Sequence, residues 1–255
     1  MRASMIGLSA LALVASAAPA LAQDDVKDFT LTGSAAIVSD YRFRGISQSG
    51  KRFAAQASAT LTHSSGFYGS FWTSSIDDYV AAGADAELDL IAGYSTTVEG
   101  FTLDGGVLYY VYPSASKGVN TDFFEPYASI KYTVGPATLK GGVAYAPKQK
   151  AIASPILGGT KDDNLYLYAE ASGAIPDTGF SLTSHVGYSK GRSFLTAGLK
   201  DYVDWNLGAA YTWRNATFAV SYVDTDAKKG EFVGNAPAFR NVAKAGVVGS
   251  VTYAF

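Results

Sequence analysis

The sequence predicts an all-β fold: a transmembrane, antiparallel, up-and-down β-barrel of about 12 strands. Three observations support this prediction: apolar and polar side chains alternate, short and long connections alternate, and aromatic residues flank the apolar faces. Alternation over stretches of ~10 residues is typical of strands in bacterial outer-membrane barrels. No segment beyond residue 22 shows a sustained helical period, and no apolar run there reaches the ~20 residues of a spanning helix.

The first 22 residues have the composition of a secretory signal peptide. Arg2 supplies a positive start, Ile6–Ala18 is apolar and small, and Ala20-Leu21-Ala22 forms a small-x-small cleavage site. A membrane anchor is the alternative, but the apolar run is short for a spanning helix, which needs ~20 residues. We therefore expect a signal peptide at residues 1–22 and one outer-membrane barrel at residues 23–255.

Each predicted strand has one apolar face and one more polar face. The last strand is the clearest, since Val251 and Tyr253 share one face while Ser250 and Thr252 share the other. Twelve is an even number, as closure of a single-chain antiparallel bacterial barrel requires. The predicted strands are 29–41, 53–61, 67–75, 85–94, 101–111, 127–134, 139–145, 165–172, 180–189, 205–213, 217–222 and 247–255.

The predicted connections differ in length in a regular way. Short periplasmic turns and long external loops are the asymmetry of outer-membrane barrels, and they place both chain ends in the periplasm. The short turns are 63–66, 99–100, 135–136, 176–179 and 214–215. The long links are 44–51, 77–83, 113–120, 148–162, 191–201 and 224–242.

Aromatic residues on the apolar faces fall into two groups around an aliphatic middle, as expected where Trp and Tyr occupy membrane interfaces. A soluble sandwich would instead bury its apolar face in one core. The group near the short turns is Phe29, Phe67, Phe101, Tyr132, Phe180, Trp213, Phe218, Tyr253 and Phe255. The group near the long links is Tyr41, Phe53, Tyr109, Tyr145, Tyr188, Trp205 and Tyr222.

Charged residues identify the face that lines the barrel interior, because a charge at the membrane midplane costs ~2–4 kcal/mol. Asp85, Glu87 and Asp89 are therefore predicted to point inward, with Asp104 opposite them on the next strand. These acids either favour cations in a narrow pore or form part of a network of lumen salt bridges. The candidate pore-lining residues are Arg42, Arg52, Asp85, Glu87, Asp89, Asp104, Lys131, Lys140, Glu170 and His185.

The predicted interior also contains aromatic side chains. Barrel diameter rises with strand number, and ~12 strands lie between filled small barrels and wide porins, so we expect a narrow pore. The aromatic residues either pack against lumen neighbours and plug the barrel, or offer a stacking surface for a sugar ring. The inward aromatic candidates are Tyr68, Trp72, Tyr110, Tyr127, Tyr166 and Tyr168.

Composition argues against several other classes of protein. Without Arg2, the 20 basic and 22 acidic residues become 19 and 22, which is too weak an imbalance for a nucleic-acid partner. Cysteine is absent, which excludes a disulfide framework. The acidic residues lack calcium-loop spacing, and we expect no metal and no cofactor. Of two histidines, His185 beside a serine would suit a lipid-modifying enzyme, but serines are common enough for that pairing to arise by chance.

One segment carries a family resemblance. Ser39-Asp40-Tyr41-Arg42-Phe43-Arg44-Gly45-Ile46-Ser47-Gln48-Ser49 resembles the early segment of the TorF family of proteobacterial outer-membrane porins, and the likeness extends over the mature chain. The terminal Tyr253-Ala254-Phe255 resembles the signal read by the barrel assembly machinery, which is thereby an implied partner. The resemblance implies no substrate. Asp40, Arg42 and Arg44 either select solutes at the external mouth or pair to hold the first loop.

These observations favour a passive channel for small hydrophilic solutes in the outer membrane of a Gram-negative bacterium, with membrane lipids as its surroundings. The alternative is a closed barrel with a structural or surface-interaction role. Ordered Tyr166 and Trp72 across an occluded lumen would favour that alternative. A lipid-modifying enzyme that uses His185 is the third hypothesis.

Overall fold

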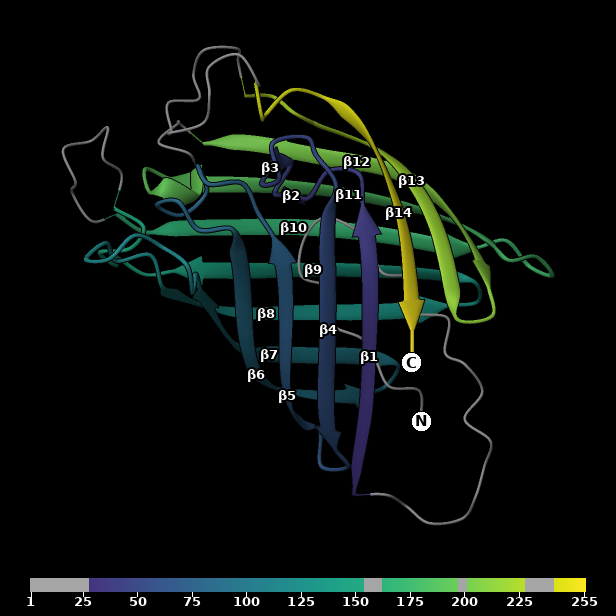
Figure 1. The fold of residues 1–255 in the computed structure, drawn as a ribbon. Helices are drawn as coiled ribbons and strands as arrows, with labels where there is room; N and C mark the ends of the chain where they lie inside the picture. The colour runs from purple at the N-terminus through teal and green to yellow at the C-terminus, as the bar shows by residue number, and fades with distance from the viewer. Residues whose placement is uncertain (1–27, 154–161, 197–200, 228–240) are drawn as a thin grey trace.

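The computed structural model describes residues 28–153, 162–196, 201–227 and 241–255, which form a closed antiparallel β-barrel (Figure 1). Every barrel strand pairs with its neighbours in the chain, as in an up-and-down barrel. The barrel strands are β1 (Phe29–Val38), β4 (Ala54–His63), β5 (Phe67–Ser75), β6 (Ala86–Val98), β7 (Phe101–Val111), β8 (Phe123–Val134), β9 (Ala137–Ala146), β10 (Asn164–Ala174), β11 (Phe180–Gly191), β12 (Tyr202–Trp213), β13 (Ala216–Thr225) and β14 (Gly246–Ala254).

The first and last barrel strands close the ring. Ile37 of β1 is paired with Val251 of β14 on one side and with Ala55 of β4 on the other. Gly33 and Phe255 exchange two backbone hydrogen bonds, of 2.9 and 3.0 Å, beyond the end of β14. Closure leaves no free sheet edge, which a barrel in lipid requires because unpaired backbone groups are costly there.

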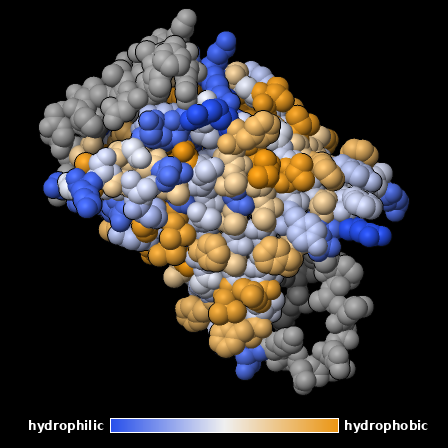
Figure 2. Space-filling model, in the orientation of Figure 1, coloured by the Kyte–Doolittle hydropathy of each residue, from blue (hydrophilic) through white to orange (hydrophobic). Residues whose placement is uncertain are grey.

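The outer face of the wall is apolar, as the alternation predicted. Aliphatic side chains point outward and are strongly exposed, among them Leu31, Leu182 and Leu207. Figure 2 shows apolar side chains gathered on the visible barrel wall, with hydrophilic ones gathered nearer the strand ends. A closed barrel with this exterior belongs in the outer membrane, where lipid covers its apolar surface. Among the described residues, no helix has the length and apolar character to cross a membrane.

The aromatic groups at the two ends of the wall are confirmed with one exception. All nine residues assigned near the short turns are large and exposed on the exterior. So is Phe53, at the end of the barrel that carries the long links, which we call the loop end. Tyr41 is the exception, since it is 6% exposed and its hydroxyl donates to Glu87 at 3.1 Å. The first strand ends at Val38, so the chain has already turned into the barrel at Tyr41.

The prediction for the first external link was wrong. Instead of projecting outward, residues after β1 form a short hairpin of β2 (Arg42–Phe43) and β3 (Ile46–Ser47), which is largely buried. In Figure 1 this hairpin lies within the ring of barrel strands. A short 3₁₀ helix, η2 (Phe194–Thr196), lies in the link between β11 and β12. The predicted signal peptide and parts of three predicted long links lie outside the described residues.

Candidate functional site: a hairpin in the barrel lumen

The β2–β3 hairpin is a tight two-residue turn, and its sequence suits that shape. Arg44 and Gly45 both have positive φ, 48° and 78°, as a hairpin turn of type I′ demands. At Gly45, any side chain would collide with Thr225 and Asp204 of the wall. The glycine therefore allows the turn to lie directly against β12 and β13.

Arg44 at the hairpin tip is bound from several sides of the wall. Its Nη2 donates to both oxygens of Glu125 in β8, at 2.7 and 2.8 Å, and its Nη1 donates to Oδ1 of Asn164 in β10 at 2.7 Å. The backbone carbonyl of Arg44 accepts a bond from the Tyr202 hydroxyl of β12 at 3.1 Å. The guanidinium also lies 4.2 Å from the ring centroid of Tyr166. The tip is thus tied to three strands.

The Arg44–Glu125 ion pair is fully enclosed. Both side chains are 2% exposed, and Tyr110 donates a further hydrogen bond to Glu125 at 3.1 Å. Burial by itself lowers the pKa of Arg44. The negative charge of Glu125, together with the neighbouring groups, raises this pKa by more, so the net shift is upward. The tip therefore carries a permanent positive charge. Loss of either partner would leave a buried, unpaired charge, a defect that typically costs ~3–5 kcal/mol.

The base of the hairpin is held by a second buried ion pair. Arg42 donates from Nε to Asp40 at 2.8 Å, and from Nη1 to the carbonyls of Gly45 and Lys244 at 3.0 and 2.9 Å. Ser47 donates to the other oxygen of Asp40 at 2.5 Å. The sequence left two alternatives for Asp40, Arg42 and Arg44. In the structure all three form buried ion pairs that hold the first link in place.

Residues of the β5–β6 link also contact the hairpin. The Tyr79 hydroxyl donates to the carbonyl of Ser47, and burial raises the pKa of Tyr79 to about 12. Asp77 pairs at 2.8 Å with Arg52, whose side chain is 64% exposed. Arg52, a predicted pore-lining residue, thus lies on the outer rim and not in the lumen.

The predicted acidic run is divided between two environments. Glu87 and Asp89 are each 2% exposed and point inward from β6, as expected. Asp85 precedes β6 and is exposed, and it is hydrogen-bonded to Ser114 in the next link. The prediction that Asp85 points into the barrel was wrong because the alternation of the strand begins only at Ala86.

Below the hairpin, charged side chains of the wall itself meet in the lumen. Lys140 of β9 lies 3.6 Å from Glu170 of β10, whose other oxygen is 3.3 Å from Nδ1 of His185 in β11. Nε2 of His185 is 3.2 Å from Asp204 of β12 and 2.8 Å from the Tyr166 hydroxyl. The structure thus brings three predicted residues, Lys140, Glu170 and His185, into one network across four strands.

The remaining predicted lumen residues complete the lining. The Tyr68 hydroxyl is hydrogen-bonded to Tyr127 and donates to Asp104 at 3.2 Å. Tyr168 stacks near His185 with ring centroids 6.1 Å apart. Two others are placed individually. Trp72 packs on Tyr41 at 5.2 Å, and Lys131 is half-buried on the inner face of β8.

The space left beneath the hairpin is small. A cavity of about 40 Å³ is bounded by Arg44, Tyr166 and Glu170 among others. A volume of this size holds only a few water molecules. The described residues contain no group of three or more His, Asp or Glu side chains placed to hold a metal ion.

The residues of this site that the sequence analysis missed include Glu125, Asn164, Tyr202 and Asp204. Glu125 lies before the predicted start of its strand at residue 127, because Pro126 argues against a strand there. Asn164 and Asp204 likewise lie just before predicted starts. Glu125 lies two residues before Tyr127, and Asp204 lies two residues before Asn206. Because residues two apart on a strand share a face, this spacing could have extended both strands and placed Glu125 and Asp204 on the inner face.

Comparisons with known proteins agree with a porin-like fold. The solved structure of the NanC porin has a TM-score of 0.58 at 10% identity, covering 89% of this chain and 99% of its own. A membrane protein from a study of in-meso crystallization has a TM-score of 0.54 at 10% identity, covering 88% and 83%. No curated protein matches the sequence significantly. The bacterial family of unknown function called Gcw_chp matches residues 22–255, and the chain therefore belongs to that family.

Proposed function

We propose that this protein is an outer-membrane channel for small hydrophilic solutes, narrowed in its loop-end half by the β2–β3 hairpin. The main support for this proposal is the position of the hairpin tip, where Arg44 is bound to Glu125, Asn164 and Tyr202 on three different strands. This arrangement places charged and hydrogen-bonding groups, rather than an apolar plug, across the lumen. Fixed charges and hydrogen-bonding groups are what select solutes in narrow pores.

The lining below the hairpin supports a hydrophilic path. Lys140, Glu170 and His185 form the charged network described above, and Asp104 accepts a bond from Tyr68 nearby. Charged groups gathered on the inner face need water or one another, because the surrounding lipid offers no partner. We therefore propose that the solute path runs along this charged lining and that the cavity of about 40 Å³ beneath the hairpin is its narrowest part, in keeping with the resemblance to TorF-family porins.

The test is reconstitution of the mature, folded chain into planar bilayers. The proposal predicts discrete conductance steps smaller than those of wide porins. It also predicts that liposomes containing the protein swell in small sugars or amino acids and resist larger oligosaccharides. Absence of steps and of swelling from correctly folded protein would contradict the proposal.

A closed barrel is the second candidate, and specific observations favour it. Tyr166 lies in the lumen and is only 2% exposed. Trp72 packs on Tyr41, in the segment that leads into the hairpin, and the cavity beneath the hairpin measures only about 40 Å³. On this second proposal the wild-type barrel does not conduct, while a variant without the hairpin does. Conductance of the two proteins in the same bilayer therefore separates the candidates.

The lipid-modifying hypothesis gains little support from the surroundings of His185. Its ring nitrogens contact Glu170, Asp204 and Tyr166, and its hydrogen bonds among the described residues do not go to a serine. A His–Ser pair is what activation of a serine nucleophile needs. We expect lipid turnover to be unchanged in His185→Ala.

A further inference from the structure

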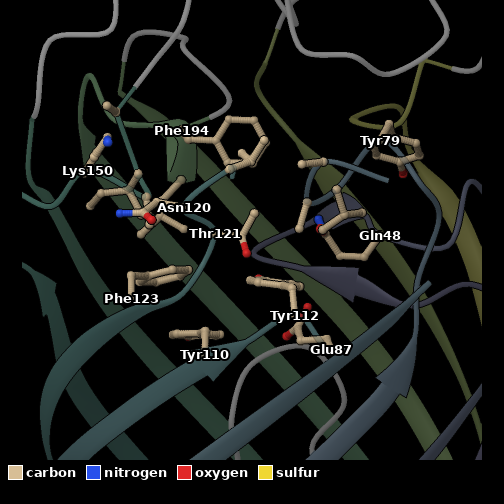
Figure 3. A pocket seen from close by; sticks show the side chains of 18 of the residues that line it. Gln48, Tyr79, Glu87, Tyr110, Tyr112, Asn120, Thr121, Phe123, Lys150 and Phe194 are labelled. Carbon is tan, nitrogen blue, oxygen red and sulfur yellow. The ribbon is translucent and has the colours of Figure 1, made fainter. Parts of the chain in front are cut away.

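A second cavity lies on the external side of the hairpin. It has a volume of about 400 Å³ and is bounded by the hairpin, the β5–β6 link and the links that follow β7, β9 and β11 (Figure 3). We call it the outer vestibule. Small-molecule sites commonly measure ~300–1,000 Å³, so the outer vestibule has room for one small organic molecule.

The inner end of the outer vestibule is aromatic. Tyr110 and Phe123 stack with ring centroids 4.2 Å apart and planes at 15°, and Phe43 of the hairpin meets Tyr110 edge-on at 6.1 Å. Figure 3 shows Tyr110 and Phe123 at the base of the cavity and Phe194 at its opposite side. Rigid rings at the base suit a flat apolar group, which can stack or pack edge-on against them.

A carboxylate lies beside this aromatic base. Glu87 borders the cavity, is 2% exposed, and accepts a hydrogen bond from Tyr41 at 3.1 Å. Asp89 follows two positions later on the same face of β6, and its Oδ1 is buried without a hydrogen-bond partner. Within the described part of the chain, the ion pairs include neither acid. Burial and mutual repulsion disfavour the charged forms of two adjacent acids, so a cation bound beside them would stabilise their negative charge.

We propose that the outer vestibule binds a small organic cation with a flat apolar body. The apolar body lies on Tyr110 and Phe123, and the positive group lies at the Glu87 end. An aromatic base also attracts the cation directly through the ring faces. Lys150 is at the other side of the cavity in Figure 3 and is exposed, so water screens its charge from the bound cation.

Binding at this site is separable from transport. The vestibule lies outside the hairpin, so a ligand reaches it from the loop end without crossing the lumen. Affinity is measured on folded protein in detergent, whereas conduction is measured in bilayers. Failure of the channel proposal therefore leaves this inference standing, and the reverse also holds.

Isothermal titration of the mature, folded chain in detergent tests the proposal with three probes that share a phenyl group. These are phenethylammonium, neutral 2-phenylethanol and the anion 3-phenylpropanoate, each corrected for titration into empty micelles. Because a charge-assisted hydrogen bond contributes more than a neutral one, we expect the cation to bind about tenfold or more tightly than the alcohol. We expect the anion to bind most weakly.

Variants locate the site. Glu87→Gln keeps an acceptor for Tyr41 but removes the charge, so the preference for the cation should fall to near the level of the alcohol. Glu99→Gln makes the same chemical change in an exposed turn at the other end of the barrel and should leave the preference for the cation unchanged. Thr121→Trp adds bulk at the cavity wall and should weaken all three probes. Circular dichroism confirms that each variant is folded.

Several results would overturn the proposal. Equal binding of cation and alcohol by the wild type would remove the role of the carboxylates. Strongest binding of the anion would assign the site to Lys150 instead. A cation preference that survives in Glu87→Gln combined with Asp89→Asn, or no binding of any probe, would also reject it.

Discussion

The two halves of the lumen are narrowed by different means. In the loop-end half, a hairpin inserted from the first link fills the space and is held by Arg44–Glu125 and Asp40–Arg42. In the other half, the strands themselves supply the filling side chains, through Lys140, Glu170 and His185. The first half can be emptied without changing the wall, whereas the second cannot. We therefore expect the hairpin to control conductance and the wall network to control charge preference.

Removing the hairpin should give the largest effect. Replacement of residues 42–47 by a short glycine–serine link takes away the insert and leaves every barrel strand in place. We expect single-channel conductance to rise severalfold, because the open cross-section becomes that of the ring itself. Replacement of the exposed turn residues 176–178, at the other end of the barrel, by glycine and serine is the matched control, and it should not change conductance. A hairpin-free barrel that conducts no better than wild type would refute the assigned constriction.

Breaking the tip ion pair should have the next largest effect. Arg44→Ala leaves the Glu125 carboxylate buried and unpaired, at a typical cost of ~3–5 kcal/mol, which favours undocking of the hairpin. We expect higher conductance with frequent switching, seen in single-channel records. Arg44→Ala combined with Glu125→Ala removes both charges and should switch less often. If the double variant switches as often as the single one, the ion pair is not what holds the tip.

Changing the wall network should alter selectivity more than conductance. Lys140→Gln removes a positive charge that faces Glu170 in the lumen. We expect the reversal potential in a salt gradient to shift toward cation preference, with a change in conductance of less than about twofold. Glu170→Gln should shift it in the opposite direction. Equal shifts of the same sign in both variants would mean that neither side chain faces the conducting path.

The smallest effect is expected at the outer rim. The Arg52 end of the Arg52–Asp77 pair is open to water, since the Arg52 side chain is 64% exposed; the Asp77 side chain is 6% exposed and also accepts a hydrogen bond from the Asp78 amide at 3.0 Å. Exposed pairs contribute ~0–1 kcal/mol, so Arg52→Ala should leave both thermal stability and conductance close to wild type. A rise in conductance like that of Arg44→Ala would show that the rim also holds the hairpin.

The barrel was predictable from the sequence because lipid imposes one rule on every strand. Outward side chains must be apolar and inward ones need not be, so alternation alone identified the wall and the inward Glu87, Tyr166 and His185. The strand ends were less certain: the sequence pattern extends to Asp85, although β6 begins only at Ala86, and Pro126 obscures the start of β8.

The hairpin was not predictable in the same way. Residues 42–47 are too few to show a period, and a long polar link is ordinarily external. Their position depends on partners far along the chain, since Arg44 binds Glu125 and Asn164, and Arg42 binds Lys244. No local pattern encodes such contacts. The sequence around Gly45 does suit a tight two-residue turn, because glycine readily adopts a positive φ. It does not indicate whether that turn points into or out of the barrel.

Hydrogen–deuterium exchange of the mature protein in detergent tests the position of the hairpin most directly. Ser47 donates its amide to Val242 at 2.9 Å, and residues 42–47 are enclosed by the wall, so their peptide should exchange about as slowly as barrel strands. The same peptide in Arg44→Ala should exchange faster. Exchange in the wild type as fast as that of the exposed turn at residues 176–178 would contradict the account.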